Sequence, residues 1–320
     1  MKKIGVLTSG GDAPGMNAAI RAVVRCGISS GFEVYGIYRG YEGLLDGEIE
    51  KLDRGDVGDI LHRGGTILKT ARSEEFRTLK GQREAAQRLS ALEISSLIVI
   101  GGNGTLKGAE SLDKLGINVI GIPGTIDNDL GYTERAIGFD TAVNTVLDAI
   151  SKIRDTSSSH ERTTVIEVMG RKSGMIALYA GLTGGAEAVL IPEKKAEISA
   201  ICRKILQGER RGKAHSIIIN AEGSGVESHE LVKKIEEGTG RQTRLVILSY
   251  LQRGGVPSMA DRLLATQCGA RAIELIEANS PSKAIGLSGN KIIDFDLQEA
   301  VNAKGIFDEE MYKLIEEISR

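Results

Sequence analysis

Two short apolar segments in the first third of this 320-residue chain each run directly into a glycine-rich turn. Residues 4–8 precede the turn SGGDAPG at residues 9–15, and residues 96–100 precede the turn GGNGT at residues 101–105. A helical pattern follows each turn, which is typical of strand, turn and helix units in a parallel sheet. Because the carboxyl ends of parallel strands meet at one sheet edge, where ligands of open α/β sheets bind, we expect one cleft lined by both turns.

A third loop of this kind carries two carboxylates. The strand predicted over residues 119–122 leads into PGTIDND at residues 123–129, which contains Thr125, Asp127 and Asp129. A carboxylate pair at a strand end suits a general base, and the threonine adds a hydroxyl donor. An Asp-rich turn without a catalytic role has the same composition, because Asp and Asn favour turns. On this stretch alone both interpretations remain open.

The composition is that of a globular protein, with 41% hydrophobic and 26% charged residues. A net charge of −2 gives no basic excess, so we expect no nucleic-acid and no membrane partner. The cysteines, Cys26, Cys202 and Cys268, show neither disulfide nor zinc spacing, which favours a reducing, cytoplasmic location. No apolar stretch is long enough to span a bilayer, and the first apolar run is too short for a signal peptide.

Local patterns predict several connections between these strands. We expect a loop after Tyr41, a short polar helix that carries Arg54 and Asp59, and a helix that begins at Leu106 after the GGNGT turn. A polar linker is expected at residues 155–160. These expectations rest on local composition alone.

Beyond residue 138 the alternation of strand, glycine and charged residue starts again. The strands expected at residues 163–168, 216–220 and 245–248 lead to MGR at 169–171, EG at 222–223 and QRGG at 252–255. An arginine on such a loop suits phosphate, because its planar fork matches the phosphate oxygens. The sequence therefore predicts a second parallel-sheet region with anion contacts of its own.

Taken together, TSGGDAPGMNAAIR, PGTIDND, RDTSSSHERT, MGR, AEG and QRGG resemble the bacterial ATP-dependent 6-phosphofructokinase family, in register along nearly the whole chain. The resemblance implies two doubly wound, Rossmann-like parallel-sheet domains with the active site in the cleft between them. The larger, nucleotide-binding domain would span residues 1–138 plus 252–306, and the smaller, sugar-phosphate-binding domain residues 139–251 plus 307–320. The family forms homotetramers that share active sites between subunits, and it serves glycolysis in the cytoplasm.

The resemblance also implies the reaction, in which the γ-phosphoryl group of MgATP passes to the 1-hydroxyl of fructose 6-phosphate. Asp127 corresponds to the base, Arg171 to the stabiliser of developing charge and Thr125 to a residue beside the transferred group, while Asp129 and, weakly, Asn103 correspond to magnesium positions. The nucleotide positions are Gly11, Arg72, Ser73, Gly102, Asn103, Gly104 and Thr105. The sugar-phosphate positions are Thr125, Asp127, Arg162, Met169, Gly170, Arg171, Glu222, Arg244, Tyr250 and Arg253, of which Arg162 and Arg244 would reach across a subunit interface.

A separate set of residues resembles the family's allosteric site, which takes ADP, GDP or phosphoenolpyruvate. Arg21 and Arg25 lie four residues apart on one helix face, which by itself fits a phosphate grip or a solvated basic face. The resemblance favours the phosphate grip. The full set is Arg21, Arg25, Arg54, Asp59, Arg154, Gly185, Glu187, Arg211, Lys213 and His215.

Glycine at two positions indicates the phosphoryl donor. Pyrophosphate-using relatives typically carry Asp where this chain has Gly104 and Lys where it has Gly124, so the resemblance implies ATP.

Several positions depart from the family pattern around the expected cleft, including Ser73, Glu74, Leu106 and Lys107 near the nucleotide. Asn103 stands where the family has Asp, Tyr250 where it commonly has His, and Met175 where it commonly has Asp. These departures leave two hypotheses open: an active, allosterically regulated enzyme, slowed at these positions, or a catalytically weakened paralogue that binds fructose phosphate and effector as a regulatory subunit. A weaker interpretation takes GGNGT as similar to the GGDGT turn of NAD or lipid kinases.

Overall fold

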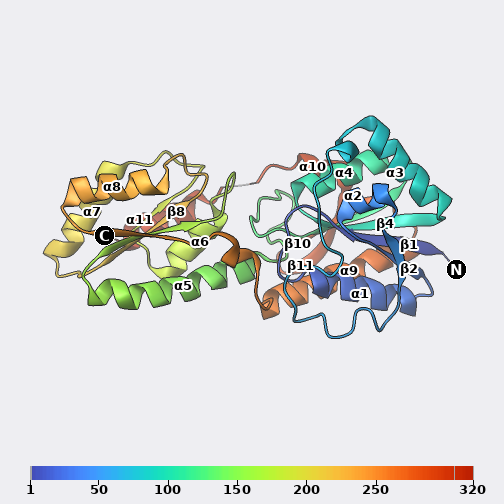
Figure 1. Ribbon diagram of the computed structural model, residues 1–320, viewed down its shortest axis with the longest axis horizontal. Helices are drawn as coiled ribbons and strands as arrows, with labels where there is room; N and C mark the ends of the chain where they lie inside the picture. Colours follow the sequence, from blue (N-terminus) through green and yellow to red (C-terminus); the bar gives the residue numbers. More distant parts are fainter. Residues whose placement is uncertain (1, 306, 320) are drawn as a thin grey trace. The chain divides into compact units, whose positions relative to one another are not determined.

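The computed structural model describes residues 2–305 and 307–319 (Figure 1). Met1, Ile306 and Arg320, at the outer limits of the expected domain ranges, lie outside the described residues. The chain divides into two compact units, Met1–Thr141 with Arg253–Gly305 and Ala142–Gln252 with Ile306–Arg320. Each unit is built on its own sheet, and the expected α/β class with parallel sheets is confirmed.

The first unit contains a seven-stranded sheet in the order β11-β10-β5-β4-β1-β2-β3. All pairings between β2 and β10 are parallel, and the edge strands β3 and β11 are antiparallel to their neighbours. Because β2 lies on one side of β1 and β4 on the other, the winding reverses beside β1, where doubly wound sheets bind ligands. The strands are β1 (Lys3–Thr8), β2 (Glu33–Ile37), β3 (Ile49–Leu52), β4 (Ile94–Gly101), β5 (Asn118–Pro123), β10 (Lys283–Ser288) and β11 (Lys291–Asp296).

Helices cover both faces of this sheet (Figure 1). On one face α1 packs closely against α9, and a Cβ at Gly269 would lie 2.6 Å from that of Ala22. On the other face the buried side chains of α2, α3 and α4 form one apolar cluster with β1, β4 and β5. The helices are α1 (Met16–Ser29), α2 (Gly40–Asp46), α3 (Leu79–Ala91), α4 (Asn103–Asp113), α9 (Met259–Glu277), α10 (Leu297–Asn302) and the short 3-10 helix η1 (Glu75–Arg77).

The second unit contains a four-stranded, all-parallel sheet in the order β7-β8-β6-β9. Its strands are β6 (Thr163–Val168), β7 (Ala188–Leu190), β8 (Ser216–Ala221) and β9 (Thr243–Ile247). Apolar side chains of α7 and α8 pack on one face of this sheet, and α6 and α11 lie on the other. The helices are α5 (Phe139–Ser159), α6 (Met175–Gly184), α7 (Ile198–Arg210), α8 (Ser228–Thr239), α11 (Glu309–Ile318) and the 3-10 helix η2 (Ser249–Arg253).

The predicted loop after Tyr41 is wrong, because the helix α2 begins at Gly40. Tyr41 is buried and stacks on Phe76 with the ring centroids 4.0 Å apart, and its hydroxyl donates to the carbonyl of Thr105 over 2.7 Å. The two glycines of this segment disfavour a helix locally, so α2 depends on burial against η1 and α4.

The polar helix predicted around Arg54 and Asp59 is also wrong, since this segment forms turns. Asp53 accepts hydrogen bonds from the backbone of Gly55 and Asp56, and Asp59 has a positive φ of 50°. Side-chain bonds to nearby backbone amides compete with a helical ladder.

The linker predicted at residues 155–160 is mostly helical, because α5 continues to Ser159. The hydroxyl of Ser157 is buried and lies 2.7 Å from that of Thr164 on β6, so a tertiary contact holds this polar helix end. The helix expected from Leu106 begins three residues earlier, at Asn103. No helix among residues 2–305 and 307–319 is long and apolar enough to cross a membrane.

Candidate active site

Three loops of the first unit gather at the carboxyl ends of the neighbouring strands β1, β4 and β5. The hydroxyl of Thr105 donates to the carbonyl of Ser9 over 3.0 Å, which joins the two glycine turns. Backbone hydrogen bonds then run from Ser9 to Ile100 and from Gly124 to Gly101. The turns expected to share one cleft therefore lie side by side at the point where the winding of the sheet reverses.

The second glycine turn is also the first turn of α4. Helix α4 begins at Asn103, so the backbone N–H groups of Asn103, Gly104 and Thr105 belong to its amino-terminal turn. Backbone N–H groups and the helix dipole at this end favour a phosphate group. A Cβ added at Gly104 meets no atom within 4 Å, whereas one at Gly124 would lie 3.1 Å from Ile100 and Met16. Open space therefore lies beside Gly104, whereas Gly124 is closely packed.

Arg72 and Ser73 follow a segment that is tied to the first glycine turn. The hydroxyl of Thr70 donates to the carbonyl of Gly10 over 2.7 Å. Arg72 is exposed, and the Ser73 hydroxyl accepts from the backbone of Phe76 at 3.1 Å. This places both predicted nucleotide positions on the chain segment that borders the glycine turns.

The acidic loop holds Asp129 beside α4. The side-chain amide of Asn103 donates to the carboxylate of Asp129 over 2.8 Å, and the amide of Asp127 donates to the hydroxyl of Thr125 over 3.2 Å. Asn128 has a positive φ of 47°, accepts from Ala136 at 2.8 Å and donates to the carbonyl of Glu134 at 3.2 Å. Sequence reasoning missed Asn128, although asparagine is one of the few residues that favour this conformation.

The acidic loop offers only a few groups that could coordinate a magnesium ion. No cluster of three or more His, Cys, Asp or Glu side chains among the described residues could hold a metal. Magnesium in phosphoryl transfer commonly uses one or two carboxylates and otherwise substrate phosphates and water. Asp129 and Asn103 fit that pattern, since rotation of the Asn103 amide would present its oxygen beside the carboxylate.

Arg253 lies beside the first glycine turn. Its Nη1 donates to the carbonyl of Asp12 over 3.2 Å, and a Cβ at Gly11 would lie 2.5 Å from the same nitrogen. With a side chain at residue 11, the end of the Arg253 side chain would have to shift. A predicted sugar-phosphate position therefore contacts a predicted nucleotide position within the first unit.

The predicted sugar-phosphate positions of the second unit follow the carboxyl ends of its strands. Nε of Arg171, after β6, donates to the carboxylate of Glu222, after β8, over 3.2 Å. Gly170 has a φ of 135°, and a Cβ at Gly223 would lie 2.1 Å from the carbonyl of Arg171, so both glycines permit this close approach. Arg171 is 73% exposed and can turn toward a ligand.

Gln252 supports this edge of the second sheet and was missed from the sequence. It is fully buried, its side-chain oxygen accepts from the backbone of Met169 at 3.2 Å and its amide donates to the carbonyl of Ser249 at 3.1 Å. Tyr250, on the same 3-10 helix, is 77% exposed. The sequence signal for Gln252 was its place in the QRGG motif, which was used only for Arg253.

Arg162 and Arg244 lie near the amino ends of the strands of the second sheet, opposite the carboxyl ends that carry Met169 and Arg171. Arg162 immediately precedes β6, and Arg244 is the second residue of the neighbouring β9. Seven residues separate Arg162 from Met169, which corresponds to about 23 Å of extended strand. Within one chain these two arginines are therefore far from the loop of Met169 and Arg171.

Candidate effector residues

The predicted effector residues of the first unit include one close pair. Nη2 of Arg25 donates to the carbonyl of Arg54 over 3.5 Å. Nε of Arg25 is buried and has no hydrogen-bond partner among the described residues. Arg21 lies one turn earlier on α1, and Asp59 follows in the turns after Arg54. This nitrogen lacks the hydrogen-bond partner that buried polar groups usually have.

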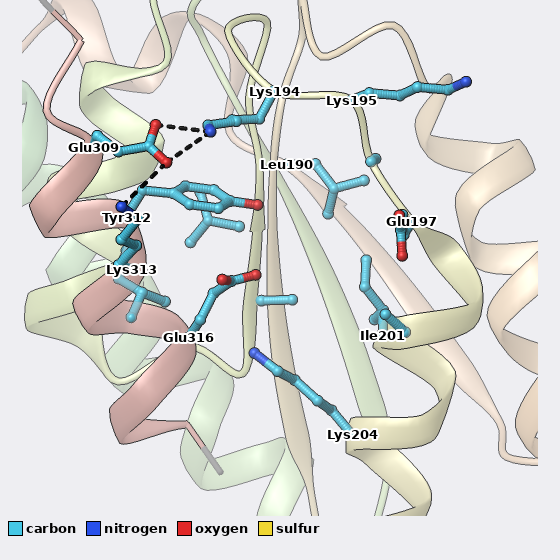
Figure 2. A pocket seen from close by; sticks show the side chains of 15 residues that line it. Leu190, Lys194, Lys195, Glu197, Ile201, Lys204, Glu309, Tyr312, Lys313 and Glu316 are labelled. Carbon is cyan, nitrogen blue, oxygen red and sulfur yellow. Dashed lines mark hydrogen bonds and ion pairs between the residues drawn. The ribbon is translucent and has the colours of Figure 1, made fainter.

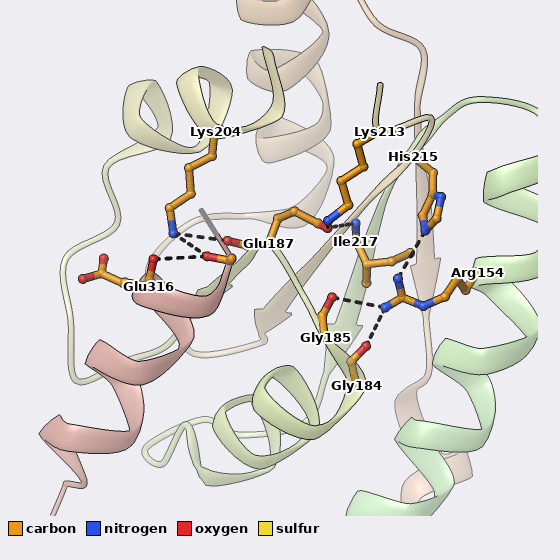
Figure 3. A network of polar contacts seen from close by, with 10 residues as sticks. Arg154, Gly184, Gly185, Glu187, Lys204, Lys213, His215, Ile217 and Glu316 are labelled. Carbon is orange, nitrogen blue, oxygen red and sulfur yellow. Dashed lines mark hydrogen bonds and ion pairs between the residues drawn. The ribbon is translucent and has the colours of Figure 1, made fainter. Parts of the chain in front are cut away.

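The effector residues of the second unit form one polar network (Figure 3). Arg154 donates to the carbonyls of Gly184 and Gly185 and lies 3.2 Å from a ring nitrogen of His215. Burial and the adjacent Arg154 lower the pKa of His215, so its ring tends to be neutral. Glu187 is buried and pairs with Lys213.

Arg211 is exposed and immediately follows α7. Its position two residues before Lys213 keeps it near the same loop. Sequence spacing alone thus supports its place in the effector set.

Comparison with known proteins

The fold and the loops define the class of protein: an α/β protein of two units, each with a parallel sheet, in which glycine turns at the strand ends suit phosphate. The phosphofructokinase family model matches residues 3–276. The chain belongs to the phosphofructokinase family, so the expected family is confirmed. The likeness of GGNGT to NAD and lipid kinases stays confined to that turn.

Curated relatives match along their whole length. The chain is 55% identical over 319 residues to the ATP-dependent 6-phosphofructokinase of Clostridium tetani and 56% identical over 319 residues to that of Alkaliphilus metalliredigens, covering 100% of each chain in both cases. The solved phosphofructokinase structure from Saccharomyces cerevisiae matches with a TM-score of 0.88 and 37% identity over 94% of this chain. The chain spans 45% of that yeast chain.

Proposed function

We propose that this chain is an ATP-dependent 6-phosphofructokinase of glycolysis. It transfers the γ-phosphoryl group of ATP to the 1-hydroxyl of fructose 6-phosphate and releases fructose 1,6-bisphosphate and ADP. The observation that carries the proposal is the meeting of both glycine turns with the acidic loop at the ends of β1, β4 and β5, in a chain of this family. The larger unit takes the nucleotide and the smaller unit the sugar phosphate.

Asp127 acts as the general base. It accepts the proton of the sugar hydroxyl as that oxygen attacks, which typically contributes roughly 10²- to 10⁴-fold to the rate. Thr125 fixes the loop through its bond to the Asp127 amide and offers its hydroxyl beside the transferred group. Because the charge of the phosphoryl group is spread over three oxygens, positioned donors stabilise it in the transition state.

The donors come from two kinds of group. The N–H groups at Asn103 and Gly104, in the first turn of α4, suit the nucleotide phosphates, while that of Thr105 donates to the carbonyl of Gly102. Arg171 supplies a guanidinium for the developing charge, and Glu222, its partner at 3.2 Å, orients it and accepts from a sugar hydroxyl. Arg72, Ser73, Gly11 and Gly102 line the nucleotide, and Met169, Gly170, Tyr250 and Arg253 line the sugar phosphate.

Asp129 and Asn103 would hold the magnesium ion that accompanies the nucleotide. When bound there, the ion would neutralise phosphate charge. With an amide in place of a carboxylate at residue 103, the protein contributes one charge fewer, so the ion depends more on ATP itself.

The active assembly is a homotetramer in which Arg162 and Arg244 bind the 6-phosphate of a sugar held by a neighbouring subunit. The support is geometric: these arginines lie at one edge of the second sheet, and Met169 and Arg171 lie at the other. For Arg162 the distance to Met169 is about 23 Å of strand, too far for one sugar phosphate to bridge. Activity then depends on assembly.

The effector residues bind ADP, GDP or phosphoenolpyruvate and regulate the enzyme allosterically. The buried, unpartnered Nε of Arg25 and the arginine and lysine of the second-unit network support an anionic ligand. The enzyme works in the cytoplasm, where its substrates are found.

The test is the initial rate of fructose 1,6-bisphosphate formation from fructose 6-phosphate and MgATP, with and without ADP. Turnover that is saturable in both substrates supports the proposal. Tight fructose 6-phosphate binding without turnover would refute it and favour a regulatory paralogue.

A further inference from the structure

A cavity of about 380 Å³ lies at the open edge of the smaller sheet, beside the edge strand β7 and between α7 and α11 (Figure 2). Its volume falls within the range of roughly 300 to 1,000 Å³ typical of small-molecule sites. None of its lining residues belongs to the substrate or effector positions proposed above. The cavity therefore has no assigned role in the proposed function.

The cavity combines an apolar floor with polar groups that converge on it. Leu190 and Ile201 are buried and supply the floor. Figure 2 shows the hydroxyl of Tyr312, the carboxylate of Glu316 and the ammonium of Lys204 directed toward the centre. Burial, followed by the charge of Glu316, raises the pKa of Tyr312, so its hydroxyl remains a hydrogen-bond donor.

The charges at the rim disfavour a simple anion. Lys194 pairs with Glu309 at 2.7 Å, and Lys313 lies 3.9 Å from the same residue. Lys195 extends away from the cavity in Figure 2. The carboxylate of Glu316 would repel an inorganic phosphate, whereas a ligand with one charge of each sign can pair an ammonium group with Glu316 and offer a carboxylate to Lys204 and Tyr312.

We propose that this cavity binds a free α-amino acid with an apolar side chain, as the zwitterion. Its carboxylate accepts hydrogen bonds from Lys204 and Tyr312, and its ammonium group pairs with Glu316. Its side chain packs on Leu190 and Ile201. No covalent step is involved.

Lys204 connects this cavity to the effector network (Figure 3). Its ammonium donates to the carbonyl of Glu187 over 3.3 Å and to the hydroxyl of Ser319 over 2.9 Å. The carboxylate of Glu187 in turn accepts from the backbone of Ile217 and pairs with Lys213. A ligand that engages Lys204 thus acts on the backbone that positions Glu187, and the amino acid is coupled to this network.

The first test is calorimetric titration of the intact chain with L-leucine and L-phenylalanine. Two truncated analogues of leucine serve as matched probes: 4-methylpentanoate lacks the ammonium group, and 3-methylbutylamine lacks the carboxylate. We expect saturable binding of at least one amino acid and at least roughly tenfold weaker binding of both analogues. This readout needs no catalysis, so it stands apart from the proposed activity.

Charge reversal on α11 provides the control within the protein. Glu316→Lys places a positive charge beside the ligand ammonium, and we expect it to weaken amino-acid binding at least roughly tenfold. Glu317→Lys makes the same change at the next residue of the helix, which is exposed and does not line the cavity, and should leave binding unchanged. No binding of either amino acid up to about 10 mM, or equal binding by both variants, would overturn the proposal.

The coupling is tested by amide hydrogen exchange of the same protein with and without the bound amino acid. We expect slower exchange in residues 187–190 and 216–218, which contain the Glu187 and Ile217 contacts, and no change there in Glu316→Lys. Unchanged exchange in these segments at saturating ligand would overturn the coupling. Slower exchange caused by phosphate instead of amino acid would overturn the assigned ligand class.

Discussion

The side-chain amide of Asn103, in the first turn of α4, donates to the carboxylate of Asp129 over 2.8 Å. The two residues stand where the resemblance places magnesium ligands, and in this chain a neutral hydrogen bond joins them. The acidic loop is therefore held in place by the protein itself, and the charge available to a cation is one unit smaller than with two carboxylates.

Asn103→Asp should make the protein depend more steeply on magnesium. Two carboxylates at this distance repel each other without a cation and bind one together when it is present. We expect a lower unfolding midpoint than the unaltered chain in a chelator, and a larger gain on adding magnesium with ATP. Asn290→Asp, in the exposed turn between β10 and β11, is the matched control. The same magnesium dependence in both variants would contradict this role for Asn103.

Asp127→Asn should lower kcat by roughly 10²- to 10⁴-fold, because the amide cannot accept the hydroxyl proton. Binding of fructose 6-phosphate should change little, since the amide keeps the size of the side chain. Asp155→Asn, on the exposed side of α5, is the control and should retain full activity. A kcat near that of the control would remove Asp127 from the role of base.

Gly104→Asp should impair ATP use without harming the fold. A side chain there projects into open space, and an acid in the first turn of α4 interacts favourably with the helix dipole. It also faces the nucleotide phosphates and repels them. We expect an unchanged or slightly higher unfolding midpoint and a raised KM for ATP, while Ser111→Asp, in the last turn of α4, should leave the KM unchanged and lower the midpoint slightly, because the dipole disfavours an acid at that end. An unchanged KM would show that the nucleotide does not pass beside Gly104.

Arg162→Ala and Asp127→Asn should complement each other if active sites are shared. Each variant alone lacks one component of every site. When the two are unfolded and refolded together, some sites pair an intact Asp127 of one subunit with an intact Arg162 of another, and activity should return to those sites. Mixing without refolding is the control. Refolded mixed assemblies that remain inactive would argue against sharing across an interface.

Asp261 should make the stability of the protein pH-dependent. The carboxylate is fully buried, accepts from the amides of Gly138 and Thr141 at 2.9 and 2.8 Å, and has a pKa raised mainly by burial. The folded protein therefore holds this proton at pH values where the unfolded chain has released it, so this contribution to stability falls as the pH rises from about 3.8 through the raised folded pKa.

The measurement is chemical denaturation of the unaltered chain and of Asp261→Asn across that pH range. The Asn variant lacks the titration, so the stability difference between the two should change with pH in the stated direction. Asp261→Ala leaves two buried amides without an acceptor and should lose about 2 to 4 kcal/mol at every pH. Parallel pH curves for the unaltered chain and Asp261→Asn would refute the assignment.

The sequence by itself determined most of the strands and the residues that follow them, although the edge strand β3 was not predicted. Residues 163–168 were predicted with the bounds that β6 has, and the glycine turns and PGTIDND follow β1, β4 and β5 as expected, because apolar periodicity and turn residues act over short distances. Resemblance added residue roles that local physics could not supply, including those of Arg162 and Arg171.

Only the tertiary structure decided which polar residues support these loops and where polar segments become helical. Tyr41 lies in a helix because its ring stacks on Phe76 and its hydroxyl reaches Thr105, and Ser157 extends α5 through its contact with Thr164. The structure shows that Gln252 supports the loop at Met169, which is distant in the sequence, and that Asn128 supports its own turn through Ala136. Burial and long-range hydrogen bonds outweigh local propensity at such positions, and the sequence alone does not reveal their partners.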